Sequence, residues 1–371
     1  MKFLYLQGGG PTSVINNSFL GVKDSISEND ELYVSEDGFY GLVRDTLLKI
    51  EREDDYSFLK NRPSSFFRSS RLNLRKDPSS LGKIIETIER HGFDCLFING
   101  GNDTMNNALI LSDALKEKGL GTKVIGIPKT IDNDLPCMDH TPGFISAANF
   151  IVECTRSMYY DNETYENGRI NILETMGREN GSLAASSVYA SKYGCRPDII
   201  LIPEYPVSLE EVIEKAISIF DEKHRCLIVV SEGTLNKEGR LLFDLQNGSD
   251  AFGNVILGGV AASLEHCFLN RGYPSRSIQT SILQRSFIAL ATDLDRKEAH
   301  DLSEEAYKLA KSGYDKVMVS LKRVSSSPYE VSYSPVPLEN VLTPVSLDGK
   351  YIMEDGYVSD DYIEYLSPLL G

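Results

Sequence analysis

The feature that most constrains the fold is an alternation of short apolar runs with amphipathic helical patterns along most of the chain. The apolar runs have the length of buried strands and lie at residues 2–6, 95–98, 124–127, 170–173, 199–202, 227–230 and 317–321. Helical patterns separate them, as at residues 208–223, where apolar side chains mark one face. This repetition predicts an α/β fold with mainly parallel sheets covered by helices. A Pro- and Ser-bearing stretch at residues 325–337 is expected to be a surface excursion.

The length and charge of the chain narrow the classes of protein to which it can belong. Its 371 residues exceed the size at which a single core stops growing, so two subdomains are expected. The formal net charge of −16 disfavours general binding to nucleic acid or to an anionic membrane surface. No apolar run is long enough to span a bilayer, and the apolar stretch at the N-terminus is too short for a signal peptide. The six scattered cysteines fit reduced thiols, and together these features predict a cytoplasmic protein.

Two glycine-rich turns follow predicted strands, GGG at residues 8–10 and GGNDT at residues 100–104. Glycine lets backbone amides approach an anion, and the start of a helix adds a favourable dipole, so the two turns together indicate a phosphate site. Any tight turn can use glycine, so either turn alone is weak evidence. Asp103 fits either a helix cap or a carboxylate that binds metal or excludes a ligand.

The third strand ends in the most informative stretch of the chain, PKTIDND at residues 128–134. Phosphoryl transfer needs positive charge on the moving group, a metal ligand and a base for the attacking hydroxyl, and Lys129, Asp134 and Asp132 can supply these in turn. A solvated turn is the alternative reading, and the two glycine turns nearby favour the functional one. Arginines further along the chain suit phosphate oxygens, although each taken alone is more often a surface residue.

In order and spacing, these motifs resemble those of phosphofructokinases. The shared motifs are the glycine turn, GGNDT, PKTIDND, MGR at residues 176–178, SEG at 231–233 and LQR at 283–285. The ending YLSPLLG at residues 365–371 resembles that of the members that use pyrophosphate. The resemblance implies two Rossmann-like subdomains with the active site in the cleft between them. Residues 1–142 and about 284–322 would form the donor subdomain, and residues 143–283 and 323–371 the sugar-phosphate subdomain.

The resemblance also implies a reaction and its residues. The reaction is reversible, Mg²⁺-dependent transfer from inorganic pyrophosphate to the 1-hydroxyl of fructose 6-phosphate, a step of glycolysis or gluconeogenesis. Asp132 matches the general base of the family, and the other catalytic positions match Lys129, Arg178 and Asp103. Metal positions match Asp134 and Asn102. The donor site matches Gly9, Gly10, Arg71, Gly101, Asn102, Asp103 and Thr104. The sugar-phosphate site matches Thr130, Asp132, Arg169, Met176, Gly177, Arg178, Glu232, Arg276, Gln284 and Arg285.

The expected donor depends on two positions. The resemblance implies the motifs GGDGS and GTIDND in members that use ATP, with glycine at the positions of Asp103 and Lys129 in this chain. An aspartate at the first position occupies the space of the nucleotide α-phosphate with a like charge, and a lysine at the second stabilises developing negative charge. Pyrophosphate is therefore the expected donor, and an ATP-dependent phosphofructokinase is the enzymatic alternative.

Three positions depart from the family pattern. Asn102 stands where many members have a magnesium-binding aspartate, and its carbonyl oxygen can coordinate metal without contributing charge. Residues 64–68 replace a more glycine-rich segment, which bears on the match at Arg71. Ile282 stands where ATP-using members have a substrate-contacting histidine. Asn102 also leaves open a non-catalytic, phosphosugar-binding regulatory subunit of the same fold.

The resemblance further implies partners. Arg169 and Arg276 match arginines usually lent by a neighbouring subunit, so a homodimer or homotetramer with shared active sites is expected. The sequence leaves open the oligomeric state, allosteric regulation, the direction of flux, and whether acceptors such as sedoheptulose 7-phosphate are used.

Overall fold

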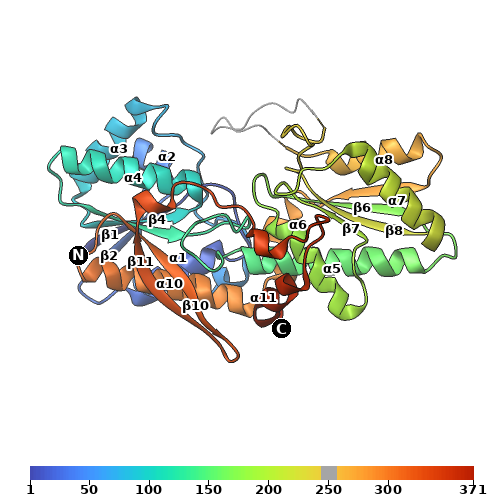
Figure 1. Cartoon of the computed structure of the whole chain (residues 1–371). Coiled ribbons are helices and arrows are strands. Elements are labelled where there is room, and N and C mark those ends of the chain that lie inside the picture. The colour runs from blue at the N-terminus through green and yellow to red at the C-terminus, as the bar shows by residue number, and fades with distance from the viewer. Residues whose placement is uncertain (244–256) are drawn as a thin grey trace.

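The computed structural model describes residues 1–243 and 257–371, which form two sheets with helices on both faces (Figure 1). The strands are β1 (Lys2–Gln7), β2 (Glu31–Ser35), β3 (Leu47–Ile50), β4 (Cys95–Gly100), β5 (Lys123–Pro128), β6 (Ile170–Thr175), β7 (Ile199–Leu201), β8 (Cys226–Ser231), β9 (Ser275–Gln279), β10 (Val317–Ser326) and β11 (Tyr329–Pro337). The helices are α1 (Ile15–Ser25), α2 (Phe39–Arg44), α3 (Pro78–His91), α4 (Asn102–Glu117), α5 (Phe144–Glu163), α6 (Ser182–Ser186), α7 (Leu209–Lys223), α8 (Val260–Leu269), α9 (Leu283–Ser286), α10 (Asp293–Lys311) and α11 (Asp360–Leu370).

The first sheet has seven strands in the order β11-β10-β5-β4-β1-β2-β3. Its five central strands run parallel, and the edge strands β3 and β11 are antiparallel to their neighbours. Because successive strand residues face opposite sides, Phe3 and Tyr5 pack against α1 and α10, whereas Leu4 and Leu6 pack against α3 and α4. The sheet is therefore buried on both faces, as a parallel sheet requires.

The second sheet has four parallel strands in the order β7-β8-β6-β9. Helices α5, α6 and α11 cover one face, and α7 and α8 cover the other. Figure 1 shows the two sheets toward opposite ends of the molecule, with α11 and the C-terminus between them. The predicted α/β class with two sheets is thus confirmed.

Local sequence signals explain where several helices begin and end. Asp77 caps α3 by accepting a hydrogen bond from the Ser80 backbone N–H (3.1 Å), Pro78 occupies the first helical position, and Gly92 ends the helix in the left-handed conformation. The predicted helix at residues 208–223 is α7, and its cap Ser208 accepts a hydrogen bond from the Glu211 N–H (3.4 Å).

All seven predicted strands are present, but residues 325–337 differ from expectation. Residues 329–337 form β11, which pairs with β10 over most of its length rather than making an irregular excursion. Prolines 335 and 337 are tolerated because β11 is an edge strand with one unpaired side. The same pairing places β11 in the seven-stranded sheet, whereas the expected division assigned residues from 323 onward to the other subdomain.

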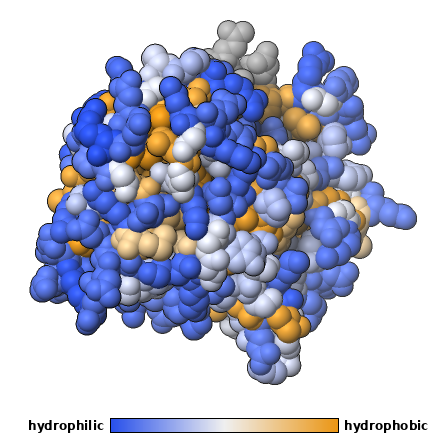
Figure 2. Space-filling model, turned by 90° about the vertical axis from the view of Figure 1, so that its left-hand side faces the viewer, coloured by the Kyte–Doolittle hydropathy of each residue, from blue (hydrophilic) through white to orange (hydrophobic). Residues whose placement is uncertain are grey.

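The surface agrees with the polar composition of the chain. On the face shown in Figure 2, hydrophilic side chains predominate and hydrophobic ones lie in separate patches. Within residues 1–243 and 257–371, none of the helices combines the length and the apolar character needed to cross a membrane.

Candidate active site

A cavity of about 450 Å³ lies where loops of the two sheets meet. Its walls come from the loops that follow the carboxyl ends of β1, β4 and β5 in the first sheet and of β6 and β8 in the second. Ligands of parallel α/β sheets gather at this position. The predicted site residues that line it are Gly9, Gly10, Arg71, Gly101, Asn102, Asp103, Thr104, Lys129, Thr130, Asp132, Asp134, Met176, Arg178, Glu232 and Arg285.

The two glycine-rich turns lie against each other at one end of this cavity. The Gly8 N–H donates to the Asn99 carbonyl (2.8 Å), which joins the ends of β1 and β4. Thr104 fills the space beside both turns, because a Cβ at Gly8 or at Gly100 would lie within 2.7 or 2.4 Å of its Oγ1. Helix α4 begins at Asn102, within the second turn, so its positive N-terminal end lies at the cavity wall.

Gly10 allows two guanidinium groups to approach the first turn. A Cβ at this position would lie 3.1 Å from Nη1 of Arg285 and 3.9 Å from Nη2 of Arg71. The two arginines are far apart in the sequence, and both line the cavity. Their joint position gives an acidic protein a local cationic site that suits phosphate oxygens.

Lys129 is a buried cation in the same wall. Its Nζ donates a hydrogen bond to the Gly10 carbonyl (2.5 Å), which links the loop after β5 to the first glycine turn. Burial lowers the pKa of Lys129 to about 8. The nearby cations Arg285 and Arg71 also lower this pKa, whereas the carboxylates of Asp132 and Asp134 raise it. A bound dianionic phosphate would favour the charged form further.

Asp132 lies at the centre of the charged groups. Its backbone N–H donates to Thr130 Oγ1 (3.1 Å), and within the described part of the chain its buried Oδ1 has no hydrogen-bond partner. Burial raises the pKa of this carboxyl group, although Arg285, Lys129 and Arg178 lower it. A carboxylate with a raised pKa and a free oxygen in a cavity is suited to accept a proton from a substrate hydroxyl.

Asn102 and Asp134 form a pair that can hold a divalent cation. Asn102 Nδ2 donates to Asp134 Oδ2 (2.7 Å), and among the described residues the buried Oδ1 atoms of both side chains have no partner. Burial and then the nearby Asp132 raise the pKa of Asp134 to about 7. Carboxylate and amide oxygens are the ligands that Mg²⁺ prefers, so the pair fits this ion. The asparagine therefore offers a ligand oxygen without adding another carboxylate to the site.

The loops of the second sheet complete the opposite wall. Ser231 Oγ donates to the Gly177 carbonyl (2.5 Å), and the Glu232 N–H donates to the Thr175 carbonyl (2.9 Å), so the turns after β6 and β8 are joined. Gly177 has φ +127°, and a Cβ there would lie 2.5 Å from the Asn180 carbonyl oxygen. Burial and then Asp132 raise the pKa of Glu232 to about 7.

Four predicted site residues do not line the cavity within one chain. Gly177 lies between the lining residues Met176 and Arg178, and Gln284 is buried in α9. Arg169 and Arg276 lie at the amino ends of β6 and β9, where Ile170 pairs with Ser275, whereas the cavity lies beyond the carboxyl ends of the strands of this sheet.

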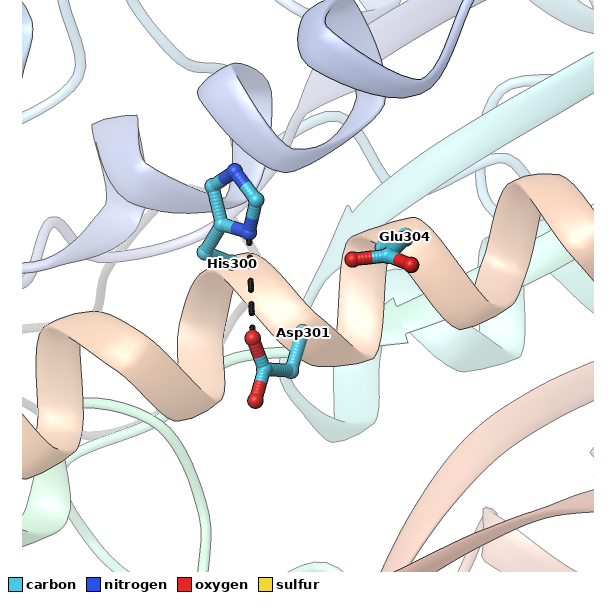
Figure 3. A group of neighbouring side chains, drawn as sticks. All are labelled: His300, Asp301 and Glu304. Atoms are coloured by element: carbon cyan, nitrogen blue, oxygen red, sulfur yellow. Dashed lines mark ion pairs between the residues drawn. The ribbon is translucent and has the colours of Figure 1, made fainter.

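A second group of potential metal ligands lies on α10, where His300, Asp301 and Glu304 project from neighbouring turns (Figure 3). These side chains are partly exposed and already take part in ion pairs. His300 Nε2 lies 3.2 Å from Asp24 Oδ2, and Lys297 Nζ lies 2.5 Å from Asp301 Oδ2. The group is therefore best described as a network of surface ion pairs.

Comparison with known proteins agrees with this geometry. The family model described as phosphofructokinase matches residues 2–310. The chain belongs to the phosphofructokinase family.

Relatives in the family include enzymes with different named substrates. The pyrophosphate–fructose 6-phosphate 1-phosphotransferase of Halomonas elongata is 31% identical, with 99% of this chain and 91% of the relative covered. The sulfofructose kinase of Alkalicoccus urumqiensis is 32% identical, with 100% and 96% covered. The crystal structure of a pyrophosphate-dependent phosphofructokinase from Marinobacter aquaeolei has a TM-score of 0.87 at 28% identity, with 100% of this chain and 91% of that chain covered.

The family match ends at residue 310, but the cavity also uses residues beyond it. Pro344 lines the wall, and the Val345 N–H donates to the Asp134 carbonyl (2.9 Å). Asn180 Nδ2 donates to the carbonyls of Val345 (2.9 Å) and Asn133 (3.2 Å), so it joins the C-terminal segment to the loop that carries Asp132.

Sequence reasoning missed several lining residues, among them Asn180, Gln279, Ser281 and Pro344. A usable signal existed only for Asn180, which follows the MGR motif by two positions. The others reach the cavity through tertiary structure.

Proposed function

We propose that the chain catalyses reversible phosphoryl transfer from inorganic pyrophosphate to the 1-hydroxyl of fructose 6-phosphate. The observation that carries this proposal is that Lys129 and Asp103 line the same cavity as Asp132. The names of several relatives support the same reaction.

In the forward direction Asp132 accepts the proton of the 1-hydroxyl group as its oxygen attacks the nearer phosphorus of pyrophosphate. The new bond joins this oxygen to phosphorus, and the bond from that phosphorus to the bridging oxygen breaks, which releases inorganic phosphate. Lys129, Arg178 and Arg285 stabilise the negative charge on the transferring phosphoryl group. All three cations act on the Asp132 carboxylate and are therefore near the hydroxyl group that it deprotonates. In the reverse direction Asp132 returns the proton.

A magnesium ion is proposed to be held by Oδ1 of Asp134 and of Asn102. When bound, the ion neutralises charge on the donor phosphates and orients them for in-line transfer. The unpartnered buried oxygens of this pair within the described residues support the assignment. A cation there would also return Asp134 to its ionised form, because its pKa of about 7 results from burial and from a neighbouring carboxylate.

The choice of donor is proposed to depend on Asp103 and Lys129. Asp103 lies in the first turn of α4, where the helix end attracts the phosphates of the donor. Its carboxylate would repel the α-phosphate of a nucleotide bound at this helix end, whereas pyrophosphate has no third phosphate.

The subunit arrangement is a further part of the proposal. Arg169 and Arg276 are proposed to bind the sugar phosphate of a neighbouring subunit, in at least a dimer. Their position side by side at the end of the second sheet away from the cavity supports this, since they cannot serve the site of their own chain from there. The six free cysteines support a reducing, cytoplasmic location.

A second acceptor, sulfofructose, is supported by one observation. Ile282 is 63% exposed and stands where, by the family resemblance, ATP-using members have a substrate-contacting histidine, which when protonated would add a cation to the acceptor site. A sulfonate carries less negative charge than a phosphate monoester, so an acceptor with a sulfonate loses less binding affinity when this cation is missing. The relative from Alkalicoccus urumqiensis is named a sulfofructose kinase. The ratio of kcat/KM for sulfofructose and fructose 6-phosphate decides between the two acceptors.

A donor comparison with the purified full-length chain tests the proposal. With fructose 6-phosphate and Mg²⁺, we expect phosphate release and bisphosphate formation with pyrophosphate and not with ATP. Asp132→Asn should lower kcat about 10²- to 10⁴-fold. Turnover with ATP alone would overturn the donor assignment. Binding of the sugar phosphate without turnover with either donor would favour the regulatory-subunit alternative.

A further inference from the structure

A buried charged cluster centred on His140 lies close to the catalytic loop, which we define as residues 130–134. The imidazole is 1% exposed. Its Nδ1 lies 2.8 Å from Asp139 Oδ2, and its Nε2 lies 2.6 Å from Glu298 Oε2. Neither His140 nor its two carboxylate partners line the cavity, so the mechanism does not use them directly.

The geometry favours a doubly protonated imidazole. A neutral imidazole has one N–H donor, so its other nitrogen would direct a lone pair at a carboxylate oxygen. Arg323 donates to Asp139 through Nη2 (2.8 Å), and the Tyr329 hydroxyl donates to Glu298 Oε1 (2.6 Å). With His140 protonated, the two carboxylates are balanced by an imidazolium and a guanidinium, whereas a neutral His140 would leave one buried negative charge uncompensated.

His140 is joined to the catalytic loop through its neighbour in the sequence. The Thr141 N–H donates to Asn133 Oδ1 (3.0 Å), and Thr141 Oγ1 donates to the Thr130 carbonyl (2.7 Å). The Thr130 N–H in turn donates to the Pro142 carbonyl (3.2 Å). Asn133 has φ +58°, a left-handed conformation that its side-chain hydrogen bond helps to hold. Residues 141–142 therefore set the path of the segment that carries Asp132.

The other side of the cluster is fixed to three further elements. Glu298 lies on α10, Arg323 lies on β10, and the Tyr365 hydroxyl from α11 donates to the Asp139 carbonyl (2.9 Å). Figure 1 shows α10, the β10–β11 hairpin and α11 converging in the lower part of the molecule. The cluster thus connects the catalytic loop to α10, β10 and α11.

We propose that His140 is a positioning residue, an imidazolium that holds the catalytic loop so that the Asp132 carboxylate faces the acceptor hydroxyl. The inference rests on the proposed function for its kinetic readout. Hydrogen bonds to the two carboxylates outweigh the effect of burial and raise the pKa of His140 to about 9, in agreement with the geometry. The charged or titratable groups around it are Asp139, Asp295, Glu298, Arg323, Tyr329, Tyr333, Tyr351 and Tyr365.

The first experiment compares the wild type with His140→Gln and with the control Asp301→Asn, which removes a surface ion pair on α10, the helix that carries Glu298. We expect His140→Gln to lower kcat about 10- to 100-fold with little change in the KM of either substrate, because a displaced base affects the chemical step. Faster amide hydrogen exchange in the peptide spanning residues 130–146 should accompany it. Asp301→Asn should change neither quantity.

A second variant, Glu298→Gln, keeps the shape of the cluster and removes one carboxylate. It should move the alkaline limit of kcat to lower pH, because the imidazolium loses an anionic partner. The double variant His140→Gln/Glu298→Gln restores charge balance and should recover part of kcat. A folded His140→Gln variant with wild-type kcat and wild-type hydrogen exchange would overturn the inference. If His140→Gln fails to fold, an unchanged alkaline limit of kcat in Glu298→Gln would overturn it. Absence of turnover with pyrophosphate in the wild type would instead count against the proposed function, and the exchange measurement would still test the role of His140.

Discussion

The amide of Asn102 donates a hydrogen bond to Asp134 across 2.7 Å, and this contact determines what the proposed metal site can offer. The donation uses Nδ2 of the asparagine and Oδ2 of the aspartate, so Oδ1 of each remains available in the cavity wall. An aspartate at position 102 would face Asp134 with a like charge unless a cation or a shared proton lay between them. The asparagine therefore keeps the site ordered before metal binds, at the expense of one negative charge.

Replacing Asn102 by Asp should strengthen Mg²⁺ binding at a pH above the pKa of Asp134, which is about 7. Cation sites gain affinity with the charge of their ligands, so we expect the Mg²⁺ concentration for half-maximal rate to fall about tenfold. A magnesium titration of the initial rate measures it. Asn106→Asp, one turn further along α4, is the control and should leave the titration unchanged. A higher magnesium requirement in Asn102→Asp would contradict the proposed ligand role.

The pH dependence of donor use should follow Lys129. Its pKa is lowered to about 8, mainly by burial, so the lysine loses its positive charge as the pH rises through that value. The kcat/KM for pyrophosphate, which reports the free enzyme, should therefore decline above about pH 8. In Lys129→Met we expect a value lower by about 100-fold and no decline with this pKa. The control Lys83→Met, at an exposed position of α3, should behave as the wild type. If kcat/KM of Lys129→Met declined above about pH 8 as in the wild type, the decline would not be due to Lys129.

The contact between the turns after β6 and β8 is tested at Gly233. A Cβ there would lie 1.9 Å from the Arg178 carbonyl oxygen and 2.8 Å from that of Gly177. Gly233→Ala must therefore separate the two turns, which we expect to destabilise the protein by about 1–3 kcal/mol and to lower kcat/KM for the sugar phosphate. Denaturant unfolding and steady-state kinetics measure the two effects. Gly349→Ala has open space around its Cβ and should change neither.

The parts of the fold that the sequence predicted are those buried on both faces. Strands such as β4 and β8 are fully buried, so their apolar runs stand out. Four strands were missed. Three of them, β3, β9 and β11, are edge strands, and β9, with the sequence SRSIQ, is largely exposed and carries no apolar run. The fourth, β2, lies inside the sheet, but the apolar run in its sequence ELYVS is only three residues long. Edge strands have few buried positions, so their hydrophobic pattern is weak.

The candidate site shows a similar division. Asp132, Asp134 and Lys129 lie in one short motif, whose residue types already indicate phosphoryl transfer. Pro344 has no such signal and Asn180 has only its position two residues after MGR, because their place in the wall depends on how the C-terminal segment packs across the two sheets. His140 was missed for the same reason, since its partner Glu298 is 158 positions away in the sequence.

The donor preference is tested most directly at Asp103 and Lys129, the two positions where the family resemblance implies glycine in members that use ATP. In Asp103→Gly combined with Lys129→Gly we expect kcat/KM for pyrophosphate to fall at least about tenfold, because a cation that stabilises the transferring group is lost. The ratio of ATP to pyrophosphate use should rise, since a carboxylate no longer occupies the first turn of α4. Glycine also weakens a helix, by about 1 kcal/mol. Asp113→Gly, on the same helix and paired with Lys316 at the surface, controls for that effect and should leave the ratio unchanged. An undiminished rate with pyrophosphate in the double variant would show that Asp103 and Lys129 do not set the donor.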